Sequence, residues 1–233
     1  MMFPIAILAG GLATRLRPLT VSLPKALVDI NGEPFIAHQL RLLAHHNFKK
    51  VILCVGYLGE MIQEFVKDGK QFKLEVDYSF DGEPLLGTAG ALKRALPSLG
   101  NDFFVMYGDS YLPCDFQAVQ KAFQKSGKTA LMTIFRNDGQ WDKSNVEFNG
   151  KEILVYDKKN ITPNMHHIDY GLGTFNSTAF SSLRENESYD LAELYQSLLK
   201  QQQLAAYEVS QRFYETGSFS GMKELKTYLS QQH

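Results

Sequence analysis

The stretch Phe3-Pro4-Ile5-Ala6-Ile7-Leu8-Ala9-Gly10-Gly11 decides the fold of this chain. It is apolar on both faces and ends in two glycines, and a helical pattern with proline in its first turn follows at residues 34–46. Apolar runs at residues 51–55 and 103–107 are each followed by a helical pattern as well. Strands that are apolar on both faces and alternate with helices are typical of a parallel sheet covered on both sides. The sequence therefore predicts an α/β fold of three layers with a mostly parallel central sheet.

The pattern changes after Thr129. Shorter strand-like pieces follow at residues 145–148, 153–156 and 168–175, and a strong helical face at residues 191–199 comes next. No repeat, low-complexity linker or shift in composition separates the two parts of the chain. We therefore expect residues 1–233 to form a single domain.

Composition and charge exclude several classes of protein. The 233 residues are 44% hydrophobic and 21% charged, which excludes a disordered or collagen-like chain. The net charge of −1 argues against nucleic acid as a partner, because such binding rests on neutralising many phosphates. No apolar run reaches the length of a membrane span, and the start of the chain lacks the basic region of a signal peptide. Cys54 and Cys114 cannot form a disulfide framework and are interpreted as buried packing thiols, so we expect a cytoplasmic protein.

The most informative residues follow the first strand, in Leu8-Ala9-Gly10-Gly11-Leu12-Ala13-Thr14-Arg15-Leu16-Arg17-Pro18-Leu19-Thr20 and the later Pro24-Lys25. Small residues let the backbone approach a ligand closely, and successive backbone N–H groups can cradle phosphates. A loop at the carboxyl end of a parallel strand also lies where open α/β sheets bind ligands. The segment is neither a P-loop nor a G-x-G-x-x-G motif. The alternative interpretation is an ordinary glycine-rich turn with solvated arginines.

This segment resembles the signature of the sugar-1-phosphate nucleotidyltransferases, G-G-x-G-T-R-L-x-P-[LM]-T followed by P-K. The resemblance runs from Ile5 to about Gly221 and departs from the family pattern at Ala13, where glycine is common. Within the family the chain is most similar to short members such as the heptose-1-phosphate guanylyltransferases. Three further matching stretches carry the resemblance: Leu86-Gly87-Thr88-Ala89-Gly90-Ala91-Leu92, Tyr107-Gly108-Asp109-Ser110 and Tyr214-Glu215-Thr216-Gly217.

The resemblance implies a Rossmann-like nucleotidyltransferase fold, in which residues 1–128 mainly bind the nucleotide and residues 129–233 mainly bind the sugar. It implies transfer of a nucleoside monophosphate from a nucleoside triphosphate, with GTP favoured, to a sugar 1-phosphate, giving an NDP-sugar and pyrophosphate. Such an enzyme serves NDP-sugar and cell-surface polysaccharide biosynthesis. We expect a monomer or homodimer without membrane partners, and the length predicts no additional C-terminal domain.

The resemblance also assigns the catalytic and metal-binding residues. Arg15 would hold the triphosphate and stabilise the leaving pyrophosphate, while Lys25 would hold phosphate oxygens near the point of attack. Asp109 and Glu215 would bind Mg²⁺, which is usually held by one or two carboxylates together with substrate phosphates. Glu215 stands where the family has aspartate. From the local sequence alone, a turn-forming residue is the commoner interpretation of Asp109, and the alternative for Glu215 is a solvated turn residue before the last helix.

The same resemblance implies which residues bind the two substrates. Glu83 would face the base edge, because a carboxylate can accept from both N1–H and the 2-amino group of guanine. Residues of the nucleotide site would further include Leu8, Ala9, Gly10, Gly11, Gly87 and Thr88. Residues of the sugar site would be Lys158 for the sugar phosphate, Asp169 for a hydroxyl, and Asn145 and Gly171 beside them. The ordinary alternatives are a helix cap for Thr88 and an exposed lysine pair for Lys158.

Three rival functions remain open at this point. One is a uridylyl- or cytidylyltransferase acting on another phosphorylated small molecule. A non-catalytic nucleotide-sugar sensor is disfavoured because Arg15, Lys25, Asp109 and Glu215 are all present. A nucleotide-binding oxidoreductase is disfavoured by the missing G-x-G-x-x-G motif.

Overall fold

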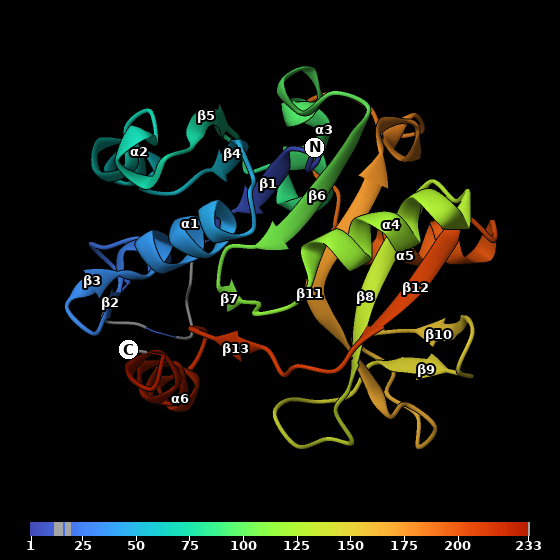
Figure 1. Ribbon diagram of the computed structural model, residues 1–233. Coiled ribbons are helices and arrows are strands. Elements are labelled where there is room, and N and C mark those ends of the chain that lie inside the picture. The colour runs from blue at the N-terminus through green and yellow to red at the C-terminus, as the bar shows by residue number, and fades with distance from the viewer. Residues whose placement is uncertain (12–15, 17–19, 233) are drawn as a thin grey trace.

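The computed structural model describes residues 1–11, 16 and 20–232, and within them one large sheet runs through the whole molecule (Figure 1). Its strands follow the order β10-β9-β11-β6-β1-β4-β5, and β8 pairs with both β11 and β12. The bounds of these strands are β1 Ile5–Leu8, β4 Lys50–Val55, β5 Glu75–Phe80, β6 Asp102–Tyr107, β8 Ala130–Arg136, β9 Val146–Phe148, β10 Ile153–Tyr156, β11 His167–Asn176 and β12 Leu204–Val209.

The first half of the chain builds the parallel part of this sheet. Strand β1 lies between β4 and β6, with Ile5 opposite both Val51 and Phe104, and β5 adds to β4 in parallel. Strand β11 then pairs antiparallel to β6 and carries the sheet into the second half. The carboxyl ends of β1, β4, β5 and β6 therefore share one edge, where a doubly wound sheet binds its ligand.

Helices cover both faces of the sheet. Helices α1 (Phe35–His45), α2 (Gly59–Val66) and α4 (Phe116–Ser126) pack on the face that carries Ile5 and Ile7. Helices α3 (Gly87–Leu99) and α5 (Leu191–Lys200) pack on the opposite face, which carries Ala6. Successive side chains of a strand point to opposite faces, so an apolar strand supplies both cores at once. The predicted three-layer α/β fold with a mostly parallel central sheet is confirmed.

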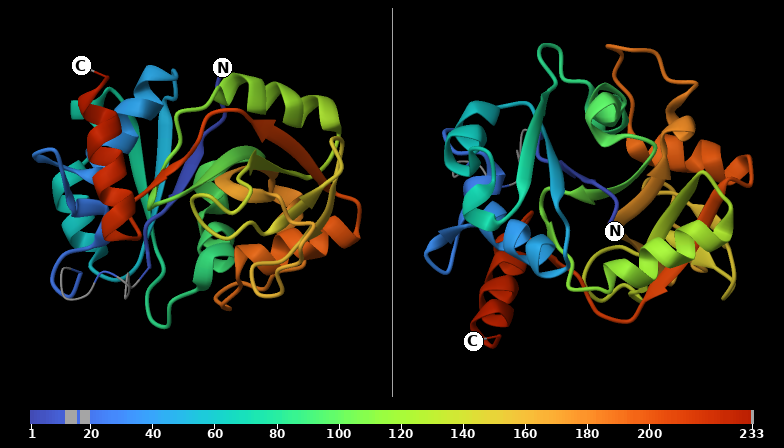
Figure 2. Two further views of the ribbon diagram at one scale, coloured as in Figure 1. Left: turned by 90° about the horizontal axis from the view of Figure 1, so that it is seen from below. Right: turned by 45° about the horizontal axis from the view of Figure 1, so that its top comes forward.

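The last part of the chain returns from the second half to the first (Figures 1 and 2). After β12 the short strand β13 (Tyr214–Glu215) pairs with β7 (Ser110–Tyr111), and helix α6 (Phe219–Ser230) follows. Helix α6 buries Met222 and Leu225 against a third apolar cluster that includes residues near the hairpin of β2 (Asp29–Ile30) and β3 (Glu33–Pro34). Three 3₁₀ turns complete the elements: Lys25–Leu27, Lys70–Phe72 and Ser177–Phe180.

No helix in the described ranges of the chain has the length and the apolar character that crossing a membrane requires.

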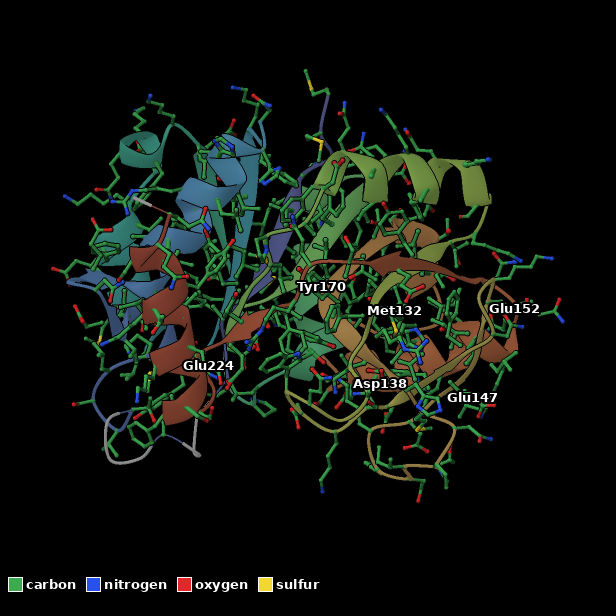
Figure 3. All side chains as sticks on the ribbon, turned by 60° about the horizontal axis from the view of Figure 1, so that its bottom comes forward. Met132, Asp138, Glu147, Glu152, Tyr170 and Glu224 are labelled. Carbon is green, nitrogen blue, oxygen red and sulfur yellow. The ribbon has the colours of Figure 1, made fainter. Side chains whose placement is uncertain are left out.

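Figure 3 shows the side chains on the ribbon, with Tyr170 near the middle of the molecule and Glu224 on helix α6. Both cysteines are buried free thiols, as predicted, and burial raises the pKa of Cys114 to about 12.

Strand β8 is not predicted by the sequence pattern. Its run Ala-Leu-Met-Thr-Ile-Phe-Arg mixes polar and apolar residues, yet Ala130 to Ile134 are all buried. The buried Thr133 is tolerated because its hydroxyl donates to the Leu172 carbonyl at 2.6 Å. Only the position of β8 between β11 and β12 explains why the run is covered on both faces.

Replacing Met132 by alanine tests the burial of β8. Met132 is fully buried, so Met132→Ala should lower the free energy of unfolding by about 2–5 kcal/mol, through lost apolar contact and a cavity. The measurement is urea denaturation followed by circular dichroism. The control is Leu154→Ala, at a side chain that is 48% exposed, which should change the free energy by less than about 0.5 kcal/mol. Equal effects of the two variants would contradict the placement of β8.

Candidate active site

The ends of β1 and β6 approach so closely that only glycine fits at residue 108. The Gly108 N–H donates to the Leu8 carbonyl at 3.0 Å, and a Cβ on Gly108 would collide with that same carbonyl oxygen. On the other side of β1, the Ala9 N–H donates to the Cys54 carbonyl at 2.8 Å. The glycine-rich loop after β1 and the Asp109 that follows β6 are therefore held next to each other.

A cavity of about 390 Å³ opens at this edge, within the range of small-molecule sites. Six residues predicted for the nucleotide site line it, together with both charged residues of the Lys25–Asp109 pair. The lining residues are Leu8, Ala9, Gly10, Gly11, Leu16, Lys25, Ala26, Cys54, Asp81, Leu85, Gly87, Thr88, Ala91, Tyr107, Gly108, Asp109 and Gly217.

Lys25 and Asp109 form an ion pair at the cavity wall. The Lys25 ammonium lies 2.8 Å from Asp109 Oδ2, and the two side chains are 15% and 36% exposed. Lys25 begins a 3₁₀ turn after Pro24, whose extended backbone directs the chain back toward the sheet. Residues 84 positions apart in the sequence thus place opposite charges side by side at the ligand-binding edge.

Glu215 joins this pair through the small ribbon of β7 and β13. Glu215 stands opposite Ser110, and the Thr216 N–H donates to the Asp109 carbonyl at 2.9 Å. A Cβ on Gly217 would lie 2.7 Å from Glu215 Oε2, 2.9 Å from the Lys25 ammonium and 3.7 Å from Asp109 Oδ2. One ammonium and two carboxylates therefore converge on Gly217, and the two predicted metal ligands lie on neighbouring strand ends.

The Glu215 carboxylate is also tied to the start of helix α6. One oxygen accepts from the Gly217 N–H and the other from the Ser218 hydroxyl, and Ser218 caps the helix by accepting from the Gly221 N–H at 2.9 Å. A Cβ on Gly221 would collide with this carboxylate. The longer side chain of glutamate is thus accommodated by glycine in the first turn of α6.

The donor set suits a small divalent cation that arrives with phosphate. The residues that the structure describes include no cluster of three or more His, Cys, Asp or Glu that would enclose an ion by itself. Mg²⁺ is usually held by one or two carboxylates, with substrate phosphates and waters as its other ligands. Asp109 and Glu215 fit that requirement.

Asp81 is a site residue that the sequence interpretation missed. It follows β5, is 6% exposed and lines the cavity, and its Oδ1 has no hydrogen-bond partner among the described residues. Burial raises the pKa of Asp81, while the backbone of Leu86 and the charge of Arg94 lower it. An unsatisfied buried carboxylate oxygen is costly unless a ligand completes it. Asp81 directly follows β5, as Asp109 follows β6 after Gly108, and this position after a strand is the signal by which Asp81 could have been found.

Glu83, unlike Asp81, does not line the cavity. Its side chain is exposed and is not part of the cavity wall, so the contact with the base that was predicted for Glu83 has no support from the geometry. The reason is the loop after β5, which turns Asp81 into the cavity and leaves the next acidic residue outside it. The base contact of Glu83 stays a prediction, and Asp81 is the acidic residue of this loop that lines the cavity.

The start of helix α3 also has a structural role, which depends on Gly87, Thr88 and Gly90. A Cβ on Gly87 would lie 2.6 Å from the Tyr189 carbonyl oxygen, and one on Gly90 would lie 2.6 Å from that of Glu187. Thr88 does not cap helix α3, because its hydroxyl oxygen accepts from the Leu191 N–H at 2.7 Å. These residues let the segment before α5 pack against α3, while Gly87 and Thr88 still line the cavity.

The four residues predicted for the sugar site are brought together in the second half. Asp169 lies 3.3 Å from the Lys158 ammonium, and its N–H donates to Asn145 Oδ1 at 2.9 Å. The Gly171 N–H donates to Asp169 Oδ1 at 3.0 Å. Tyr107 joins this group to the nucleotide cavity, because its hydroxyl donates to Asp169 Oδ2 at 3.2 Å and its side chain lines the cavity. The predicted catalytic Arg15 lies outside the described residues, as does Ala13.

Comparison with known proteins identifies the family of this chain. The family model described as nucleotidyl transferase matches residues 5–232. The chain therefore belongs to the nucleotidyl transferase family.

Two curated relatives show how the match is distributed. A mannose-1-phosphate guanyltransferase of Aspergillus oryzae is 37% identical over 136 residues, which are 57% of this chain and 37% of that protein. The D-glycero-alpha-D-manno-heptose 1-phosphate guanylyltransferase of Campylobacter jejuni is 26% identical over 212 residues, which are 91% of this chain and 93% of that protein. The chain thus spans well under half of the Aspergillus enzyme but nearly all of the Campylobacter one.

Solved structures share the fold. HddC from Yersinia pseudotuberculosis, complexed with GMP-PN, superimposes with a TM-score of 0.82 at 21% identity, covering 98% of this chain and 100% of that one. The inositol-1-phosphate CTP transferase from T. maritima superimposes with a TM-score of 0.79 at 19% identity, covering 98% and 96% of the two chains.

The raised pKa of Asp81 predicts a pH-dependent cost to stability. A carboxyl whose folded pKa lies above its ordinary value of 3.8 contributes stability below that value, and this contribution is lost as the pH rises through the folded pKa. Asp81→Asn should therefore raise the midpoint of thermal unfolding of the ligand-free protein at about pH 7.5, and raise it less at about pH 4. The exposed Glu83→Gln serves as control and should shift neither midpoint. A lower midpoint for Asp81→Asn at both pH values would contradict the prediction.

Proposed function

We propose that this protein transfers a nucleoside monophosphate from a nucleoside triphosphate to a sugar 1-phosphate, releasing pyrophosphate and an NDP-sugar. One observation carries the proposal: Lys25 and Asp109 line a ligand-sized cavity on the carboxyl edge of a parallel sheet, and Glu215 meets them at Gly217, which lines the same cavity. Family membership and the relatives named as guanylyltransferases support it.

In the proposed reaction a phosphate oxygen of the sugar phosphate attacks the α-phosphorus of the triphosphate, and pyrophosphate leaves. Negative charge builds on both sides of the transferred group, so catalysis consists mainly of positioning and charge neutralisation. Lys25 lies where it can hold phosphate oxygens, with Asp109 fixing its ammonium at 2.8 Å. Arg15 keeps its proposed role in holding the triphosphate and the leaving pyrophosphate.

Asp109 and Glu215 are proposed to hold Mg²⁺ together with the triphosphate. The bound ion would neutralise phosphate charge and orient the triphosphate. The support is the donor set, two carboxylates beside a cavity that the backbone of the glycine-rich loop completes. Glu215 would keep its contact to the start of α6 through one oxygen and present the other.

The two substrates divide between the halves of the chain. We propose that residues 1–128 mainly bind the nucleotide and residues 129–233 mainly bind the sugar, within one domain whose sheet is continuous from β6 to β11. The proposed sugar-phosphate contact is Lys158, with Asn145 and Gly171 beside it. A cytoplasmic monomer or homodimer in NDP-sugar and polysaccharide biosynthesis fits this chemistry.

Guanine is the proposed base, and Asp81 its proposed contact. Asp81 lines the cavity, and the Oδ1 of its carboxylate is buried without a hydrogen-bond partner among the described residues. Guanine presents two adjacent donors, N1–H and the 2-amino group, which one carboxylate can accept together. The Campylobacter relative that spans nearly the whole chain is named a guanylyltransferase, which supports the same base.

The proposed activity is tested by pyrophosphate release from four nucleoside triphosphates, each against a panel of sugar 1-phosphates with Mg²⁺. Lys25→Ala should fold and lose about a hundredfold in turnover, because one charge-assisted donor to a reacting phosphate contributes on the order of 3 kcal/mol. Lys49→Ala, at an exposed lysine away from the cavity, is the matched control and should keep parental turnover. Turnover of Lys25→Ala within about threefold of the parent would remove this residue from the mechanism.

If the base is guanine, GTP and ITP should differ in their rates as substrates, because inosine keeps N1–H and lacks the 2-amino group. GTP should be the better substrate, and Asp81→Asn should narrow the gap because an amide offers one acceptor where the carboxylate offers two. Glu83→Gln should leave the GTP to ITP ratio unchanged. Competition kinetics with GTP, ITP, UTP and CTP give the ratios. A preference of about tenfold or more for UTP or CTP would show that the base is not guanine.

A further inference from the structure

Asp169 is the most enclosed carboxylate of the second half near the cavity, with a side chain that is 3% exposed. It lies on β11, at the point where pairing with β8 shifts register between Asp169 and Gly173. The shift lets the Gly171 N–H fold back and donate to Asp169 Oδ1 at 3.0 Å. The backbone of β11 therefore fixes the orientation of this side chain.

The other carboxylate oxygen is occupied by two tyrosine hydroxyls. Tyr107 and Tyr156 donate to Asp169 Oδ2 at 3.2 Å and 3.1 Å. Burial, with a smaller contribution from the charge of Asp169, raises the pKa of both tyrosines well above the ordinary value. Both hydroxyls therefore stay protonated and act as donors to the carboxylate.

Lys158 closes this arrangement. Its ammonium lies 3.3 Å from Asp169 Oδ2 and 3.3 Å from the Tyr107 hydroxyl oxygen. It also lies 4.9 Å from the ring centroid of Tyr107 and 5.8 Å from that of Tyr156, within the range of cation–π attraction. The Lys158 side chain remains 42% exposed, so its ammonium is held on one side and open on the other.

The hydrogen bonds of Asp169 leave little room for a substrate at one of its two carboxylate oxygens. Oδ2 faces two hydroxyls and one ammonium, which exceed the two lone pairs of that oxygen, whereas Oδ1 faces one backbone N–H. A sugar hydroxyl would reach Oδ2 only by displacing a donor that is already in place. The contact to a sugar hydroxyl that the sequence assigns to Asp169 stays a prediction, and the donors around Oδ2 point to a second role for this carboxylate.

We propose that Asp169 is a positioning residue, which holds the Lys158 ammonium directly at 3.3 Å and fixes the Tyr107 and Tyr156 rings beside it, where the ammonium receives the phosphate of the sugar 1-phosphate. We name Asp169, Tyr107, Tyr156 and Lys158 the lysine clasp. A lysine side chain has many rotamers, and fixing it before binding removes the cost of ordering it at the moment the anion arrives. The proposal rests on the proposed function only for the identity of the anion.

The test measures binding by calorimetry without nucleoside triphosphate, so that no turnover is needed. The probes are mannose 1-phosphate and inorganic phosphate. Asp169→Asn should weaken both about tenfold, because it acts through the lysine that holds the phosphate group. Tyr156→Phe, which keeps the ring and removes one donor, should weaken both by a smaller factor. Lys159→Met, at the exposed neighbour of Lys158, should change neither.

The combination of Asp169→Asn with Lys158→Met separates positioning from direct contact. If Asp169 acts through Lys158, the double variant should bind both probes as weakly as Lys158→Met alone, within about twofold. Multiplied effects of the two changes would overturn the proposal. So would an Asp169→Asn variant that weakens mannose 1-phosphate but not inorganic phosphate, since this pattern belongs to a sugar contact. Thermal midpoints check that each variant folds.

The two proposals fail in different ways. A wild-type protein that binds both probes through the lysine clasp but turns over no sugar 1-phosphate contradicts the proposed function alone. A wild-type protein that turns over sugar 1-phosphates while Asp169→Asn binds both probes normally contradicts the clasp alone. Absence of binding of either probe to the wild type overturns the clasp.

Discussion

The contact between the Gly108 N–H and the Leu8 carbonyl sets the position of everything else in the site. It holds the ends of two parallel strands so close that residue 108 has no room for a side chain. The glycine-rich loop continues from one strand end, and Tyr107 and Asp109 flank the other. Because the ends of β1 and β6 lie this close, Asp109 can pair with Lys25, and Tyr107 can contribute to the lysine clasp around Lys158.

The carboxylates around the cavity differ in their hydrogen-bond and ion-pair partners. Asp109 pairs with Lys25, Glu215 accepts from the start of α6, and Asp169 is occupied by two hydroxyls, a backbone N–H and Lys158. Asp81 alone of these four keeps a buried oxygen without a partner in the part of the chain that the structure describes. A buried carboxylate oxygen without a partner is costly, and a ligand that brings its own donors would remove that cost.

The return of the chain through β13 and α6 makes the site depend on both ends of the sequence. Glu215 reaches Asp109 only because β13 pairs with β7, and α6 then packs against residues near the first hairpin. Within the described residues, Arg212 pairs with Glu224 of α6 at 2.5 Å and so links the crossing segment to the helix. Loss of α6 packing would release Glu215, although no catalytic group lies on the helix itself.

The sequence by itself determined the alternation of strands and helices, the glycine-rich segment directly after β1, and the family to which the chain belongs. It did so because these properties are local, written in apolar periodicity, glycines and short motifs around Lys25, Asp109 and Glu215. Tertiary structure alone decided that β8 is a central strand, that Asp81 rather than Glu83 lines the cavity, and that two tyrosine hydroxyls and the Lys158 ammonium surround Asp169 Oδ2. Each of these depends on which residues from distant parts of the chain become neighbours, and so on burial and hydrogen-bond partners that no local pattern specifies.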